Sequence, residues 1–296
     1  MHGDPLRGAL LLLAALFLFA GMDTVTKFLT AHYEVPLVVA MRYLLHTLLM
    51  VILLAPRQGR RLVQTQRTGL VLVRAASLAI ASLCVGLALQ RMPVAETTSI
   101  VFLAPLMVVL LARPVLGERI GPLGWLAAVT GFVGVLLIVR PGSGLDPTGV
   151  VFALGVAGAT VIYFLLSRLL ARTEQTLSLL FYAALVGAVV FGLDLPWSWG
   201  GPAPGALEVA LFLAMGSAAG LGHFLLTAAY RHAPASLLAP MNYLQLLWAA
   251  LLGWLVFGHV PDHLSLLGMG VVAISGVLIA LKSGRVRGAG DRLRPL

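Results

Sequence analysis

The chain has 296 residues, of which 60% are hydrophobic and only 10% are charged, and its mean hydropathy is +0.99. A soluble domain carries about 25% charged residues, so this composition excludes a water-soluble globular protein. The formal net charge is +9. It does not indicate nucleic-acid binding, because the basic residues lie in short loops between apolar runs, where positive charge sets membrane topology.

Ten apolar segments follow one another along the chain, most of them about 20 residues long, which is enough for a helix to cross a bilayer. They cover residues 8–28, 36–55, 69–90, 94–115, 121–139, 147–169, 177–194, 207–230, 235–257 and 263–282. Strands of a membrane barrel alternate apolar and polar residues, and these segments do not. The sequence therefore predicts an all-α membrane protein with ten transmembrane helices. We interpret the first segment as a retained helix, because no small-x-small cleavage motif follows it.

The distribution of positive charge predicts the orientation. Fifteen of the twenty Lys and Arg residues lie at cytoplasmic ends if the N-terminus is cytoplasmic, and three, Lys27, Arg91 and Arg140, lie at the opposite ends. Cytoplasmic loops carry an excess of Lys and Arg. We therefore expect a multi-pass protein of a bacterial-type inner membrane, with both termini in the cytoplasm.

An internal repeat divides the chain into two halves. The recurring tripeptides are Pro93–Ala95, Leu116–Glu118 and Gly134–Leu136, and then, about 141 residues later, Pro234–Ser236, Phe257–His259 and Gly276–Leu278. We expect two five-helix repeats, residues 1–140 and 141–284, followed by a basic cytoplasmic tail, residues 285–296. Because five is odd, the halves enter the membrane in opposite directions, and such inverted repeats hold a substrate site near the midplane. The predicted architecture is two inverted repeats around a central cavity.

Four ionisable residues lie within the first two segments, where charge is costly and usually functional. Asp23 and Lys27 are four residues apart on one predicted helix face, with the acid first, the favourable order. Arg42 and His46 have the same spacing on the next segment, and Arg42 falls at about the depth of Asp23. These four predict an intramembrane charge network. Either Asp23 forms a structural pair with Arg42 or Lys27, or the group handles substrate or protons.

Other polar residues near the segment ends have simpler interpretations. Arg74 is one turn inside its segment and is expected to extend toward the cytoplasm. Glu96 begins the fourth segment, where a negative charge suits a helix N-terminus. His259, Asp262 and His263 surround a proline at a segment boundary, and we expect a solvated turn there rather than a metal site.

The later segments carry polar and aromatic residues at helical spacing. Gly216 and Gly220 permit close helix approach, and His223 follows on the same face in mid-membrane. Such side chains either bond to neighbouring helices or line the central cavity. The residues predicted to bind substrate in that cavity are Tyr163, His223, Asn242, Gln245 and Trp248.

Several short motifs resemble the drug/metabolite transporter superfamily, specifically its EamA-type members. They are Pro36 to Arg42, Ala104-Pro105, Gly117-Glu118-Arg119, Gly131 to Gly134, Ala229-Tyr230, Tyr243, Trp248-Ala249 and Phe257-Gly258. The resemblance covers residues 8–282, in two copies that are in register. His259 departs from it, because the family often has glutamate there. The mixture of motifs is most similar to YddG-like amino-acid exporters.

This resemblance implies a transporter that exports amino acids and related small metabolites by alternating access, with the lipid bilayer and a small substrate as its partners. A cationic-drug or quaternary-amine efflux transporter is the first alternative; it would depend on an intramembrane acid facing its cargo, and Asp23 lies beside basic residues. A membrane-embedded enzyme is the second. No enzyme motif is present in the sequence, and neither a cofactor nor a metal is expected.

The orientation is open to a direct test. A reporter fused after Gly201 is expected to report the periplasm, and one fused at the C-terminus the cytoplasm, because of the bias in positive charge. Paired alkaline phosphatase and green fluorescent protein fusions measure the two positions. The same signal at both would mean that the helix count is wrong.

Overall fold

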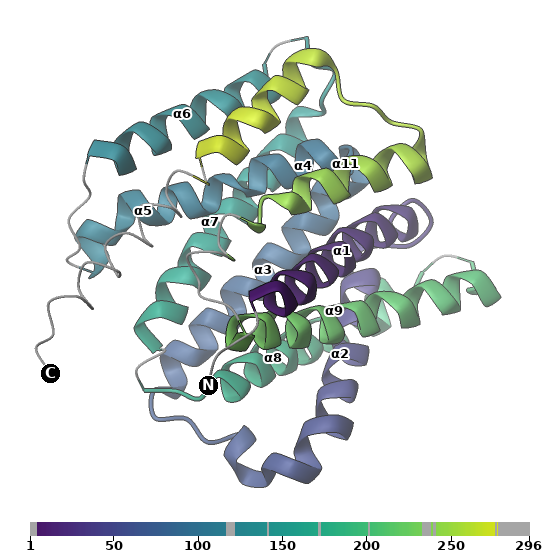
Figure 1. Cartoon of the computed structure of the whole chain (residues 1–296). Coiled ribbons are helices and arrows are strands. Elements are labelled where there is room, and N and C mark those ends of the chain that lie inside the picture. Colours follow the sequence, from purple (N-terminus) through teal and green to yellow (C-terminus); the bar gives the residue numbers. More distant parts are fainter. Residues whose placement is uncertain are drawn as a thin grey trace, which may run out of the picture.

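The computed structural model describes residues 5–116, 122–140, 142–170, 173–200, 202–232, 238, 241–275 and 277, and these residues contain helices and no strand. Figure 1 shows the helices packed side by side along most of their lengths. In chain order they are α1 (Pro5–Leu29), α2 (Val35–Gln58), the short η1 (Gly59–Leu62), α3 (Thr68–Arg91), α4 (Val94–Val101), α5 (Leu103–Leu116), α6 (Pro122–Ile138), α7 (Pro147–Leu170), α8 (Thr176–Ser198), α9 (Ala206–His232), α11 (Leu244–Phe257) and the helix His263–Ser275.

The all-helical membrane fold is confirmed. Six of the described helices are long and apolar enough to cross a membrane, and four shorter apolar helices accompany them. The predicted segment 94–115 is divided in two at Phe102. Pro105 explains the break, because it has no N–H to donate to the carbonyl of Val101. The ninth predicted segment, 235–257, lies partly outside the described residues, so the count of ten spans stays a prediction.

The two halves interlock rather than lying apart. The most extensive helix contacts pair α1 with α9, α3 with α7, and α2 with α8, each joining the N-terminal half to the C-terminal half. Both α3 with α8 and α2 with α9 also pack together. In the predicted repeats α1, α2 and α3 correspond to α7, α8 and α9. Exchanging each helix for its counterpart turns the α1–α9 contact into the α7–α3 contact and maps the α2–α8 contact onto itself. The pattern is that of an approximate two-fold axis between the halves.

Glycines allow the closest of these approaches. A Cβ atom at Gly134 of α6 would lie 2.8 Å from the carbonyl oxygen of Gly268, so the two backbones meet where neither residue has a side chain. On α9, a Cβ atom at Gly216 would collide with the side chain of Leu45. The predicted close approach at Gly216 is therefore confirmed, and it brings α9 against α2 just ahead of His223.

Candidate functional site

A group of polar side chains lies inside the bundle on helices of both halves. We call it the central polar cluster, and its members are Asp23, Arg42, Tyr43, His46, Arg74, Ser82, Tyr163, Ser167 and His223. They come from α1, α2 and α3 of the first half and from α7 and α9 of the second. Their placement follows from the packing of α2 and α3 against α7, α8 and α9.

Two histidines from different halves meet in this cluster. The rings of His46 on α2 and His223 on α9 are stacked, with centroids 5.8 Å apart and planes 10° apart. Phe19 of α1 lies 5.1 Å from the His223 ring. Gly220 lies beside the pair, since a Cβ atom there would be in ordinary van der Waals contact with the His46 ring at 3.5 Å. Each histidine was singled out in the sequence, but no pattern within one helix indicated that they stack.

Arg74 joins three helices. Its guanidinium donates from Nε to Ser167 Oγ (2.6 Å), from Nη1 to the Leu179 carbonyl (2.9 Å) and from Nη2 to Tyr163 Oη (2.8 Å), and its Cζ atom lies 4.2 Å from the Tyr163 ring centroid. The side chain is only 4% exposed. The expectation that Arg74 extends to the cytoplasm was wrong, because α7 and α8 offer three acceptors closer than water.

Lys27 does not pair with Asp23. Its Nζ atom donates to the carbonyls of Leu89 and Met92, both at 2.7 Å, at the end of α3. The last carbonyls of a helix have no intrahelical donor, and the helix dipole makes this end attractive to a cation. Asp23 interacts with Arg42 through their charges, but among the described residues neither forms an ion pair within 4 Å. Of the two predicted pairings, the Asp23–Lys27 pair was therefore wrong.

Of the residues predicted to bind substrate around α11, Trp248 lies against α1. Trp248 packs edge-to-face on Phe17 at 5.1 Å and belongs to an apolar cluster with residues of α1 and α9. The Asn242 amide contacts the Leu238 carbonyl at 3.5 Å, and Gln245 is half-buried one turn before Trp248. The structure thus brings His223 to His46 and Tyr163 to Arg74, while Trp248 packs on α1. That these residues line one cavity stays a prediction.

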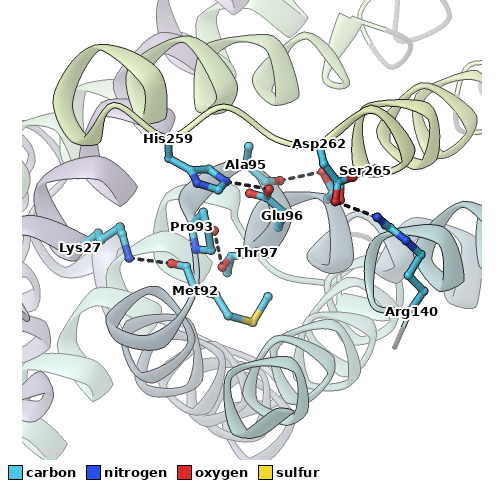
Figure 2. Close-up of polar contacts among 11 residues, drawn as sticks. Lys27, Met92, Pro93, Ala95, Glu96, Thr97, Arg140, His259, Asp262 and Ser265 are labelled. Atoms are coloured by element: carbon cyan, nitrogen blue, oxygen red, sulfur yellow. Dashed lines mark hydrogen bonds and ion pairs between the residues drawn. The ribbon is translucent and has the colours of Figure 1, made fainter. Parts of the chain in front are cut away.

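A second polar group lies at the end of the bundle that is predicted to face outward. We call it the Glu96 network, and its members are Lys27, Glu96, Arg140, His259 and Asp262 (Figure 2). Glu96 is 3% exposed, and its Oε1 accepts a hydrogen bond from His259 Nε2 at 2.9 Å. Glu96 Oε2 is buried and has no hydrogen-bond partner among the described residues.

The Glu96 contact adds to two expectations. Glu96 lies in the first turn of α4, as expected, and its side chain also reaches across to the loop after α11. The His259 side chain is 39% exposed, so the turn is solvated as expected, but it also makes this defined contact. The acid that the family often has at 259 would repel Glu96, whereas histidine donates to it.

The Glu96 network continues through an ion pair on its exposed side. Arg140 Nη2 lies 2.7 Å from Asp262 Oδ2, and Asp262 Oδ1 accepts from the Ser265 backbone N–H at 2.7 Å. The Ser265 N–H and then Arg140 lower the pKa of the Asp262 carboxyl to about 2. A lowered carboxyl pKa stabilises the folded state at pH values above the unperturbed pKa of 3.8, and this stabilisation is lost as the pH falls toward 2. The ion pair therefore persists at physiological pH.

A cavity of about 320 Å³ lies between α2, the α8–α9 connection and α9. Its walls are mostly apolar, and they include Tyr33, Met41, Trp199 and Phe212. None of the five residues predicted to bind substrate lines it. It is therefore not the cavity that the sequence predicted.

Comparison with known proteins agrees with this architecture. The EamA-like transporter family matches residues 6–140 and again residues 147–281. The pseudopaline exporter CntI of Pseudomonas aeruginosa is 30% identical over 280 residues, covering 92% of this chain and 95% of its own. An S-adenosylmethionine uptake transporter of Rickettsia bellii is 31% identical, and the match covers 64% of this chain and 65% of its own. A riboflavin transporter of Rhizobium johnstonii is 30% identical, and the match covers 64% of this chain and 63% of its own. A solved crystal structure matches with a TM-score of 0.63 at 20% identity, covering 92% of this chain and 98% of that one.

The structural role of Arg74 leads to a prediction about stability. Replacing Arg74 with Gln removes most of three hydrogen bonds between helices, and at about 0.6 kcal/mol for each the expected loss is about 2 kcal/mol. The melting temperature of detergent-purified protein, followed by size-exclusion fluorescence, is expected to fall. The control is Arg57→Gln on exposed Arg57. Equal melting temperatures for both variants would show that the Arg74 contacts do not hold α3 to α7 and α8.

Proposed function

The chain belongs to the EamA-like transporter family, and we propose that it exports amino acids and related small metabolites across the inner membrane by alternating access. The observation that carries this proposal is the central polar cluster. Polar and charged groups inside a membrane protein are costly and mark substrate or ion pathways. Here they lie where helices of the two halves meet, which is where a transporter built from inverted repeats binds its substrate.

The two-fold pattern of helix contacts supports the inverted repeat. In such transporters one half rocks against the other around a fixed site. The substrate would then bind beside the stacked histidines, between α2 and α9. We propose that His223, Asn242, Gln245, Trp248 and Tyr163 contribute to that site, with the amides and the tryptophan supplying neutral hydrogen bonds and an apolar wall.

The Glu96 network suits a gate at the outer end. Its bonds join α4 and the end of α6 in the first half to the segment 259–262 in the second. Opening toward the periplasm would break these contacts, while a closed network would leave the site accessible from the cytoplasm. Glu96 is held through a single oxygen, so that few bonds need to break.

The direction is proposed from the relatives, and the amino-acid substrate class from the resemblance of the sequence motifs. The relative matched over 92% of the chain is named an exporter of pseudopaline, whereas the S-adenosylmethionine uptake transporter matches over 64%. We therefore favour export. A cationic-drug pump is less compatible with the central polar cluster, because Asp23 shares it with Arg42 and Arg74, which would repel a cation.

Counterflow tests the proposed function. Proteoliposomes loaded with an unlabelled amino acid are expected to accumulate the same labelled amino acid transiently, for at least one member of a panel of amino acids, and protein-free liposomes are not. Counterflow of riboflavin or S-adenosylmethionine but of no amino acid would contradict amino-acid transport. Binding of a labelled amino acid without counterflow would contradict transport altogether.

A further inference from the structure

The charges of the central polar cluster do not balance. It holds two guanidinium groups, Arg42 and Arg74, against one carboxylate, Asp23. The remaining members are hydroxyls and imidazoles. A charge buried away from water is costly unless it is paired and hydrogen-bonded. The protein part of the cluster therefore favours an added negative charge.

The two arginines are held in different ways. Arg74 donates to three neutral acceptors, which satisfy both edges of its guanidinium. Arg42 is only 7% exposed, and no carboxylate of the described residues lies within ion-pairing distance of it. Its Cζ atom is 5.2 Å from the ring centroid of Tyr43. Arg42 is thus the buried cation with capacity for an anionic partner.

The segment of α2 that carries Arg42 is packed closely against α3, α8 and α9. The neighbouring Tyr43 shares a hydrogen bond of 2.7 Å with Ser82 on α3 and packs against Gly187 on α8, where a Cβ atom would collide with the ring. One turn along α2, His46 stacks on His223. Guanidinium, imidazole and hydroxyl groups all supply N–H or O–H donors. A buried arginine among other donors, at the boundary between the halves, is an arrangement suited to a carboxylate, which a guanidinium binds through two parallel hydrogen bonds.

We propose that Arg42 binds a carboxylate of the transported substrate, so that the cargo is a carboxylate-bearing metabolite. This inference rests on the proposed transport function, and it names the residue that would bind the carboxylate that amino acids carry. When the substrate is present, its carboxylate supplies the negative charge that the cluster lacks. Asp23, which interacts electrostatically with Arg42, would then face the cationic part of a zwitterionic substrate.

The test compares carboxylates with their neutral amides. Detergent-purified wild-type protein is screened for thermal stabilisation by aliphatic, aromatic and acidic amino acids, by dicarboxylates and tricarboxylates, and by the matching carboxamides. At least one carboxylate is expected to stabilise the protein, and its amide is expected to bind roughly ten- to hundredfold more weakly, as for a lost hydrogen bond to a charged group. No stabilisation by any carboxylate, or equal stabilisation by carboxylate and amide, would overturn the proposal.

Variants at position 42 locate the effect. In Arg42→Gln the preference for the carboxylate over its amide is expected to disappear, and in Arg42→Lys, which keeps the charge but not the planar fork, to be reduced. Arg57→Gln, on an exposed arginine of the same helix, is expected to behave as wild type. If Arg42→Gln does not fold, Arg42→Lys and the wild-type comparison still decide. A full preference in Arg42→Gln or Arg42→Lys would show that another group binds the carboxylate.

The same proteins separate this proposal from the transport proposal. Carboxylate-selective binding that depends on Arg42, without counterflow in proteoliposomes, would leave the binding site intact and reject transport. Counterflow that is equal for carboxylate and amide, or unchanged in Arg42→Gln, would support transport and reject the role of Arg42.

Discussion

A charged side chain inside a bilayer needs a partner in the protein or in its ligand, and this constraint organises the bundle. The apolar faces of these helices are similar in composition. Because lipid tails are as apolar as those faces, the hydrophobic effect does not favour one neighbouring helix over another. The polar contacts supply that selection. Arg74 joins α3 to α7 and α8, and Lys27 joins α1 to the end of α3. Arg74 thereby holds the second half against the first, whereas Lys27 fixes α1 to α3 within the first half.

The same constraint separates structural charges from functional ones. Arg74 and Lys27 use neutral oxygens of neighbouring helices, so their contacts are complete without a ligand. The His46–His223 stack joins α2 to α9, and buried Arg42 has no carboxylate of the described residues within ion-pairing distance. Glu96 occupies an intermediate position, since it is bonded to His259 but retains a buried oxygen without a partner among the described residues. Incomplete contacts of this kind suit the parts of a transporter that must rearrange.

Much of the fold could be predicted from the sequence, because hydrophobic run length, proline positions and the charge bias are local properties. The first predicted segment, 8–28, lies within Pro5–Leu29, and the third, 69–90, within Thr68–Arg91. The polar contacts were harder to predict. Helical spacing placed Asp23 and Lys27 on one face, but it could not show that Lys27 finds better acceptors on another helix.

The histidine stack and the Glu96–His259 contact illustrate the same limit. Each joins residues of different halves, so that no spacing within a segment reports it. A weak signal was present at His259, where the family often has an acid and this chain has a residue that can donate to one. The histidine at position 259, taken together with Glu96 at the start of α4, could have indicated the Glu96–His259 hydrogen bond.

The central claim is that the two halves move relative to each other and open the Glu96 network around a substrate at the central polar cluster. The most direct measurement is the distance between spin labels at Ala31 and Val260, exposed positions near that network, in a Cys84→Ala background in lipid nanodiscs. The account predicts one short distance without substrate, and a second, longer population when a counterflow-active substrate is added. A distance distribution that is the same with and without that substrate would contradict it.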